Sequence, residues 1–291
     1  MKLDAKTMAI LQGLQRNELT EALVYERLAD RVKKEDDAQT LRSIAAEERK
    51  HADIWRSYTN ADVKPSGAKV AMLSFLAKVL GYTFVLKKME NGEHSAVKGY
   101  GELSKKLPEA QRILEEEEVH EAKLLDMLDE ESLQYVGSMV LGLSDALVEL
   151  SGTLAGLTFA LQNTRLIALS GLITGISATL SMASSEYLSA KSEGRTDALK
   201  SCTYTGVAYL LTVALMVLPY LLISNGGYLS AMFIMLGTVV LIILGFTYYI
   251  SVAKNLSFRR RFMEMAGISL SVAGISFVIG ILVKRFLGID I

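Results

Sequence analysis

The sequence has 291 residues, of which 51% are hydrophobic and 22% are charged, and its formal net charge is −1. This composition excludes disordered and collagen-like chains, and without a basic excess no nucleic-acid partner is expected. The single cysteine, Cys202, excludes an internal disulfide framework, a Cys-rich zinc site and a four-cysteine iron site.

Charge is distributed unevenly along the chain. Residues 1–132 hold 21 basic and 25 acidic residues, whereas residues 133–291 hold only 10 and 7 and are otherwise mostly apolar. We therefore predict two domains, a soluble one at 1–132 and a membrane domain at 133–291. The elements predicted in both domains are helices, so the expected fold class is all-α.

Helical spacing of apolar residues predicts four helices in the soluble domain. Their expected ranges are about 7–32, 37–58, 68–105 and 108–128, with a point of interruption near Asn91-Gly92 in the third. Four helices of this length joined by short loops form an antiparallel bundle by default.

Two of these helices carry the same motif, a glutamate followed three residues later by a histidine. These pairs are Glu48 with His51 and Glu117 with His120, and each pair lies on one helix face. The other two helices supply Glu18 and Glu93, each followed by a tyrosine seven residues later. Such a duplicated helix pair is the pattern of di-iron carboxylate bundles, in which the ligands project inward.

In this pattern residues 8–130 resemble the rubrerythrin branch of the ferritin-like family. The resemblance implies six ligands of a di-iron site: Glu18, Glu48, His51, Glu93, Glu117 and His120. Carboxylate and imidazole ligands without thiols suit iron or manganese. The neighbouring glutamates are predicted to be mostly solvated, with Glu21 or Glu90 as an alternative ligand of an additional ion; they are Glu21, Glu47, Glu90, Glu116, Glu118 and Glu121.

Five apolar stretches in the second domain are long enough to span a lipid membrane. They are 134–161, 165–190, 202–223, 228–253 and 265–284. Seven basic residues fall in the two loops on one side, namely Lys191, Arg195, Lys200, Lys254, Arg259, Arg260 and Arg261. The positive-inside rule then predicts a cytoplasmic soluble domain and an external C-terminus. We expect the membrane to be a prokaryotic cell membrane.

Ionisable side chains inside the first two spans predict a path for an ion. Asp145 and Glu149 lie four residues apart on one face of the first span, and Met182 and Glu186 do so in the second. A charged residue within a span is costly and by default marks an ion or substrate pathway. The motifs Gly152-x-x-x-Gly156 and Gly171-x-x-x-Gly175 are expected to pack these two helices closely together.

The segments Gly142-Leu-Ser-Asp145-Ala-Leu and Ser181-Met182-Ala-Ser-Ser-Glu186-Tyr-Leu-Ser resemble the vacuolar iron transporter family. The resemblance covers about residues 133–288. It implies a homodimer of five-span subunits that moves Fe²⁺, and often Mn²⁺, out of the cytosol in exchange for protons. In this family the Asp and Met at these positions face the path, whereas a Glu found in many plant members is here Thr174.

Two functions remain open from the sequence. The favoured one is a metal transporter whose cytoplasmic bundle captures, senses or oxidises iron. The alternative is a ferroxidase or peroxide-reducing di-iron enzyme that the membrane domain only anchors. A single apolar helix is sufficient for anchoring, and five spans with carboxylates exceed that need.

Overall fold

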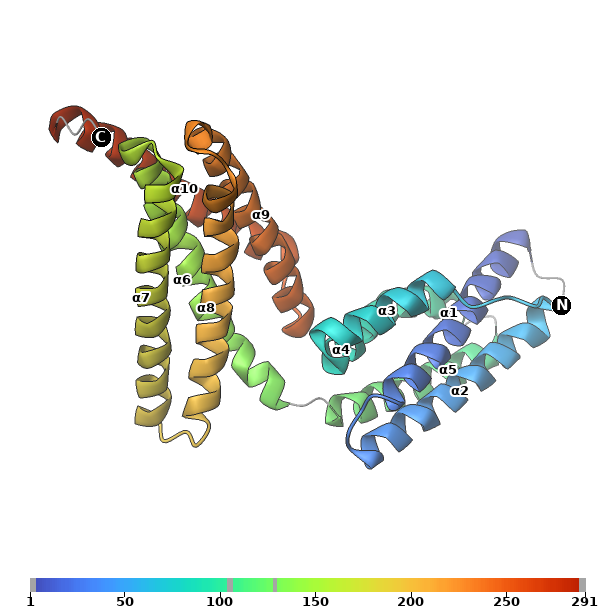
Figure 1. Ribbon diagram of the computed structural model, residues 1–291. Helices are drawn as coiled ribbons and strands as arrows, with labels where there is room; N and C mark the ends of the chain where they lie inside the picture. Colours follow the sequence, from blue (N-terminus) through green and yellow to red (C-terminus); the bar gives the residue numbers. More distant parts are fainter. Residues whose placement is uncertain (1–3, 104–106, 128–129, 288–291) are drawn as a thin grey trace. The chain divides into compact units, whose positions relative to one another are not determined.

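The computed structural model describes residues 4–103, 107–127 and 130–287, apart from the side chains of 93–103, 125–126, 130–134, 225 and 287. The described residues form ten α-helices, one short 3-10 helix and no β-strand, which confirms the all-α prediction (Figure 1). The chain divides into two compact units, Met1–Asp129 and Glu130–Ile291, called the N-terminal unit and the membrane unit below.

The N-terminal unit contains five helices: α1 (Ala5–Ala29), α2 (Glu35–Thr59), α3 (Gly67–Leu80), α4 (Tyr82–Leu103) and α5 (Pro108–Asp126). Helix α1 begins after Asp4, whose Oδ1 accepts a hydrogen bond of 2.7 Å from the backbone N–H of Thr7 and so caps the helix. Helices α1 and α2 pack lengthwise through fully buried apolar side chains, among them Val24, Leu41 and Ile44. Helices α1 and α2 carry three of the metal-ligand candidates, Glu18, Glu48 and His51.

The third predicted helix is two helices. The break falls at Gly81, with φ of +90°, and the chain continues as α helix through Asn91 and Gly92, where we had placed the interruption. A positive φ costs little at glycine but strains other residues, so Gly81 permits the turn between α3 and α4. Among its described residues, the N-terminal unit therefore has five helices where four were predicted.

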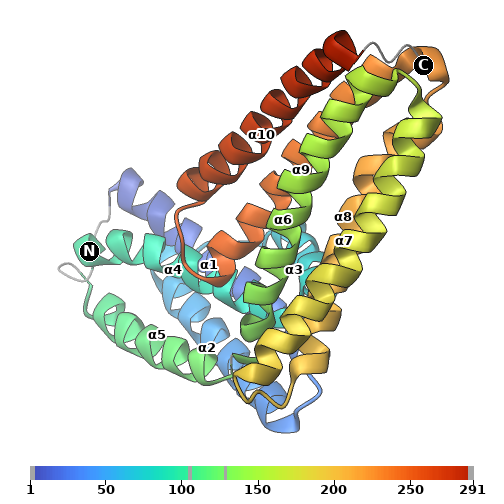
Figure 2. The same ribbon diagram turned by 90° about the vertical axis from the view of Figure 1, so that its left-hand side faces the viewer.

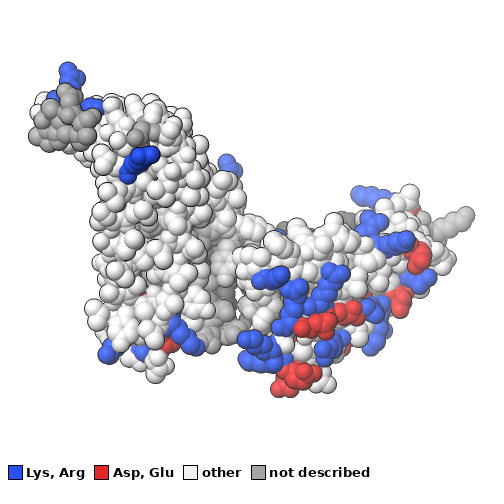
Figure 3. Space-filling model, viewed as in Figure 1, with Lys and Arg blue, Asp and Glu red and all other residues white. Residues whose placement is uncertain are grey.

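The membrane unit confirms the five predicted spans and makes the protein an integral membrane protein. Its helices are α6 (Glu130–Leu161), α7 (Thr164–Ser192), α8 (Ala198–Leu222), α9 (Tyr228–Ala253) and α10 (Phe258–Leu287), with the short helix η1 (Asn225–Gly227) before α9. The fifth span begins at Phe258, earlier than expected. The visible face of this unit is mostly uncharged, with Lys and Arg near its ends (Figure 3).

Helix α6 is the central helix of the membrane unit, since it packs against α7, α8, α9 and α10 (Figure 2). Our expectation that both glycine motifs join the first two spans holds for Gly171 alone, where an added Cβ would lie 2.7 Å from Leu154 Cδ2 of α6. Gly152 and Gly156 face α10, where a Cβ added at Gly280 would lie 2.3 Å from the carbonyl oxygen of Gly156. Gly175 faces Val213 of α8. Close approach is thus used between α6 and α10 and between α7 and α8.

Candidate metal centres

The N-terminal unit brings five of the six predicted ligands into one cluster. Glu18, Glu48, His51 and Glu117 each offer a ligand atom, and these atoms all lie within 4.8 Å of one another. His120 joins them, because its Nδ1 lies 3.3 Å from Glu48 Oε1 and 3.5 Å from Glu117 Oε2. The ligands come from α1, α2 and α5. The sixth, Glu93, lies outside the residues whose side chains are described.

The centre of this cluster is shielded from solvent. Glu18, Glu48, His51 and His120 are at most 3% exposed, whereas the Glu117 side chain is 16% exposed. Trp55, one helical turn after His51, donates its indole N–H to Glu18 Oε1 over 3.2 Å. Buried carboxylates and imidazoles are rarely stable unless they are paired or bind a metal.

Two further carboxylates, Glu47 and Glu116, hold the outer nitrogens of the histidines. We expected both to be solvated, but His51 Nε2 lies 2.8 Å from Glu116 Oε2, and His120 Nε2 contacts Glu47 Oε2. Each carboxylate thus reaches the histidine of the opposite motif. This leaves Nδ1 of both imidazoles facing Glu48 and Glu117. A carboxylate on the outer nitrogen is the usual arrangement behind a metal-binding histidine, because it fixes the tautomer.

Charge within the cluster shifts the pKa values strongly. Burial alone would lower the pKa of His51, but the nearby carboxylates of Glu117, Glu48 and Glu116 outweigh it and raise the pKa to about 10. His120 likewise has a pKa of about 10, raised against burial by Glu117 and Glu48. The two imidazoles in turn lower the pKa of Glu48 to about 2 despite its burial. Burial and the neighbouring Glu48 raise the pKa of Glu18 well above its usual range.

These residues fit a divalent-metal site. Glu48 Oε2 and His120 Nδ1 are buried and have no hydrogen-bond partner among the described residues. Leaving a buried polar atom without a partner costs about 1–3 kcal/mol, and a bound cation would remove that cost. Carboxylate oxygen with imidazole nitrogen is a donor set suited to iron and manganese.

Glu21 and Glu90, the alternative ligands of an additional ion, each face a lysine. Lys69 Nζ lies 3.1 Å from Glu21 Oε1, and Lys87 Nζ lies 2.8 Å from Glu90 Oε1. Burial raises the pKa of Glu21 to about 7, although Lys69 opposes this shift. The ammonium groups supply the positive charge at both places, which weakens the case for a further cation.

Metal binding by the cluster is expected to strengthen as the pH rises. An imidazole binds a metal only when it is neutral, and both histidines have a pKa of about 10. Below that pH a cation must displace up to two protons, so its apparent Kd should fall about tenfold to a hundredfold per pH unit. Mn²⁺ titration calorimetry on the detergent-solubilised protein between about pH 6 and pH 8 measures this dependence.

Folding stability without added metal should follow the opposite trend. Both histidine pKa values are raised above the unfolded value of about 6.5. The stability due to the imidazolium forms is therefore complete below about pH 6.5 and is lost as the pH rises towards 10.

For the metal-binding prediction, a Kd for Mn²⁺ that does not change with pH would contradict the assignment of the histidines as ligands.

The membrane unit places Asp145 and Glu149 beside a tyrosine that the sequence analysis missed. The Tyr209 hydroxyl, on α8, donates to Glu149 Oε2 over 3.0 Å and lies within electrostatic reach of Asp145. The tyrosine is 1% exposed, while Asp145 is partly buried and Glu149 is exposed. Two carboxylates and a phenol are thus grouped on the central helix and its neighbour.

Glu186 belongs to a second polar group of the membrane unit. Its Oε1 accepts hydrogen bonds from Ser138 of α6, at 2.7 Å, and from Ser201 of α8, at 2.5 Å. Met182, one turn away on α7, packs against the apolar core of the unit. The four predicted path residues therefore divide into the Asp145–Glu149 pair with Tyr209, the Glu186 group and a packed Met182.

Of the two units, only the membrane unit contains a segment that matches a known protein family. Searches of curated proteins and of solved structures gave no match. One family model matches, over Val136 to Ala198, a segment that contains all four predicted path residues. Residues 136–198 are thus a match to the VIT family, a family of iron and manganese ion transporters.

Proposed function

We propose that this protein transports divalent metal, Fe²⁺ and also Mn²⁺, out of the cytosol in exchange for protons. One observation carries the proposal: the central membrane helix holds two carboxylates, Asp145 and Glu149, within the segment that matches the VIT family. The N-terminal unit is then a cytoplasmic di-metal domain that captures, senses or oxidises the metal.

The chemistry of the Asp145–Glu149 pair supports ion exchange. A cation stripped of water needs compensating negative charge, because an unpaired ion in hydrocarbon is prohibitively costly. When the cation leaves, two neighbouring carboxylates repel each other, and protons relieve that repulsion. A thioether on the path, as proposed for Met182, would favour Fe²⁺ or Mn²⁺ over Mg²⁺ and Ca²⁺, since hard ions gain nothing from sulfur.

The basic residues of the membrane unit support the proposed orientation. Three of the loop cations lie between or beside the ends of α7 and α8, and four more lie at or after the end of α9. Loops rich in Lys and Arg remain on the cytoplasmic side. Because five spans separate the two ends, the N-terminal unit is cytoplasmic and the C-terminus external.

The buried cluster supports a ferritin-like, rubrerythrin-type role for the N-terminal unit. Glu18, Glu48, His51, Glu117 and His120, together with Glu93, would hold the di-iron site. Bound iron would supply the redox chemistry of a ferroxidase. The chain's own residues bury the cluster, orient the imidazoles through Glu47 and Glu116, and accept or release protons at Nδ1.

A membrane-anchored enzyme is the second candidate, favoured by the buried two-histidine cluster. In that case the carboxylates inside α6 would have no task. Iron uptake into sealed vesicles containing the full-length protein, with and without a pH gradient, decides between the two. The transporter fills the vesicles and responds to the gradient, whereas an anchored ferroxidase consumes Fe²⁺ outside without filling them.

The protein is expected to be a homodimer in mild detergent. Glu149 and several serines of α7 are exposed within membrane spans, among them Ser177, Ser181, Ser184 and Ser185. Polar side chains at this depth are better covered by another protein surface than by lipid. Light scattering of the solubilised protein measures the mass of the protein component, and a monomer that still transports iron would contradict the dimer.

A further inference from the structure

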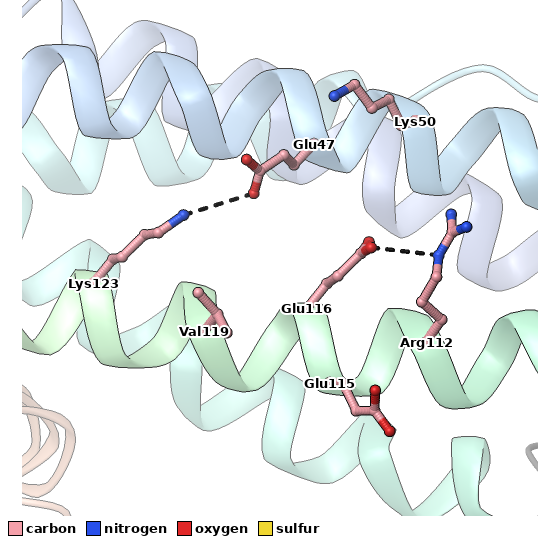
Figure 4. A pocket seen from close by; sticks show the side chains of 7 residues that line it. All are labelled: Glu47, Lys50, Arg112, Glu115, Glu116, Val119 and Lys123. Carbon is pink, nitrogen blue, oxygen red and sulfur yellow. Dashed lines mark ion pairs between the residues drawn. The ribbon is translucent and has the colours of Figure 1, made fainter.

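A groove of about 690 Å³ lies between α2 and α5 (Figure 4). It is lined by Glu47, Lys50, Arg112, Glu115, Glu116, Val119 and Lys123. Two of these residues, Glu47 and Glu116, are the carboxylates that contact the outer nitrogens of His120 and His51. The groove therefore ends one side chain away from the buried cluster.

Exposure increases stepwise from the cluster into this groove. Both histidine side chains are 1% exposed, whereas those of Glu47 and Glu116 are 34% and 44% exposed. In this groove, Glu47 and Glu116 link the cluster to solvent. Carboxylate oxygens along such a route can replace the water ligands of a hydrated divalent cation in steps.

Each groove carboxylate also contacts a basic residue on its outer side. Arg112 Nε lies 3.3 Å from Glu116 Oε1, and Lys123 Nζ lies 3.9 Å from Glu47 Oε2, so both face the groove (Figure 4). These basic side chains are 61% and 41% exposed. Ion pairs this exposed are worth about 0–1 kcal/mol. An arriving divalent cation can therefore displace them from the carboxylates.

We propose that divalent cations reach the buried cluster through this groove, and that Glu47 and Glu116 are the carboxylates that first bind them. The inference rests on the proposed di-metal role of the N-terminal unit. The cation then moves past the imidazole rings to the Nδ1 atoms, which lie on the cluster side of the rings that Glu47 and Glu116 contact at Nε2.

Association of Co²⁺ with the full-length protein in detergent tests the proposal. The probe is the visible absorbance of bound Co²⁺, taken as the difference from the variant His51→Ala/His120→Ala. The double variant Glu47→Gln/Glu116→Gln should bind about tenfold more slowly, since both carboxylates that first bind the cation are lost. Glutamine keeps an oxygen acceptor for the Nε2–H, so the histidines stay in place. Glu115→Gln also removes a negative charge from the groove but has no histidine contact, and it should bind at the wild-type rate.

A plug in the groove provides a second, independent measurement. Val119 lines the groove and is 51% exposed, so Val119→Trp should obstruct it. An obstructed route slows binding and release alike, so association and chelator-driven release should both fall about tenfold with an unchanged Kd. Ala122→Trp, at an exposed position of α5 outside the groove lining, is the matched control.

The outcomes separate the two levels of inference. Wild-type association rates in both groove variants, or equal slowing by Glu115→Gln, would overturn the route while leaving the cluster intact. Slowed binding with a weakened Kd in Val119→Trp would also overturn it, since that indicates damage to the cluster. Wild-type protein without any Co²⁺ difference signal would instead overturn the di-metal role itself.

Discussion

Replacing Asp145 by asparagine should abolish metal transport while leaving metal binding by the N-terminal unit unchanged. Asparagine keeps the size of the side chain and leaves the Tyr209–Glu149 hydrogen bond in place, but it removes the charge. A charge left uncompensated within a span costs about 3 kcal/mol, so a cation without the Asp145 carboxylate should cross at least about a hundredfold more slowly. Iron uptake into sealed vesicles measures the effect.

Glu264→Gln is the matched control for this prediction. Glu264 also lies within a span, in α10, but it is bound by Arg260 and Arg261 at 3.0 and 3.4 Å and lies apart from the Asp145 group in sequence and contacts. Its neutralisation should leave the uptake rate at the wild-type level. Vesicles containing Asp145→Asn that fill with iron as fast as wild type would remove Asp145 from the path.

The spans and the helical class could be predicted because each depends on a property summed over many residues. Twenty apolar positions identify a span whatever their neighbours, so all five spans were found, although the start of α10 at Phe258 was placed too late. The break at Gly81 depends on one φ angle, whereas the Asn91-Gly92 pair, the stronger turn signal in the sequence, lies where the helix continues. Likewise, glycine spacing predicts close helix packing without naming the partner, which for Gly156 is α10.

In the candidate sites, too, residues set by local sequence could be predicted, whereas residues set by contacts between helices could not. The ligand motifs were visible because a Glu three residues before a His places both on one helix face. Glu47 and Glu116 were missed because their partners lie on another helix, although the repeated Glu-Glu-x-x-His sequence was a usable signal. Tyr209 gave no such signal, since a tyrosine in an apolar span has no periodicity that distinguishes it.

The double variant His51→Ala/His120→Ala should lose the roughly two Fe or Mn ions expected per chain in the N-terminal unit. Mutation of a residue that only hydrogen-bonds to a metal ligand already weakens metal affinity about 10–100-fold. Removing both imidazoles should therefore exceed that loss, because Glu48 and Glu117 would have to neutralise the ions without nitrogen donors. Metal analysis after dialysis against trace Fe²⁺ or Mn²⁺ gives the stoichiometry.

Loss of binding is informative only if the unit still folds. Alanine leaves Glu48 buried beside Glu18 and without its imidazolium partners, and such an uncompensated charge costs about 3–5 kcal/mol. The variant His51→Gln/His120→Gln avoids much of this cost, because the amide N–H groups can still donate to the carboxylates, yet glutamine is a poor ligand for iron. Both double variants should lose the ions while circular dichroism stays helical. Unchanged metal content in the glutamine variant would exclude the histidines as ligands, whereas Glu115→Ala, at an exposed position of α5, should retain both ions.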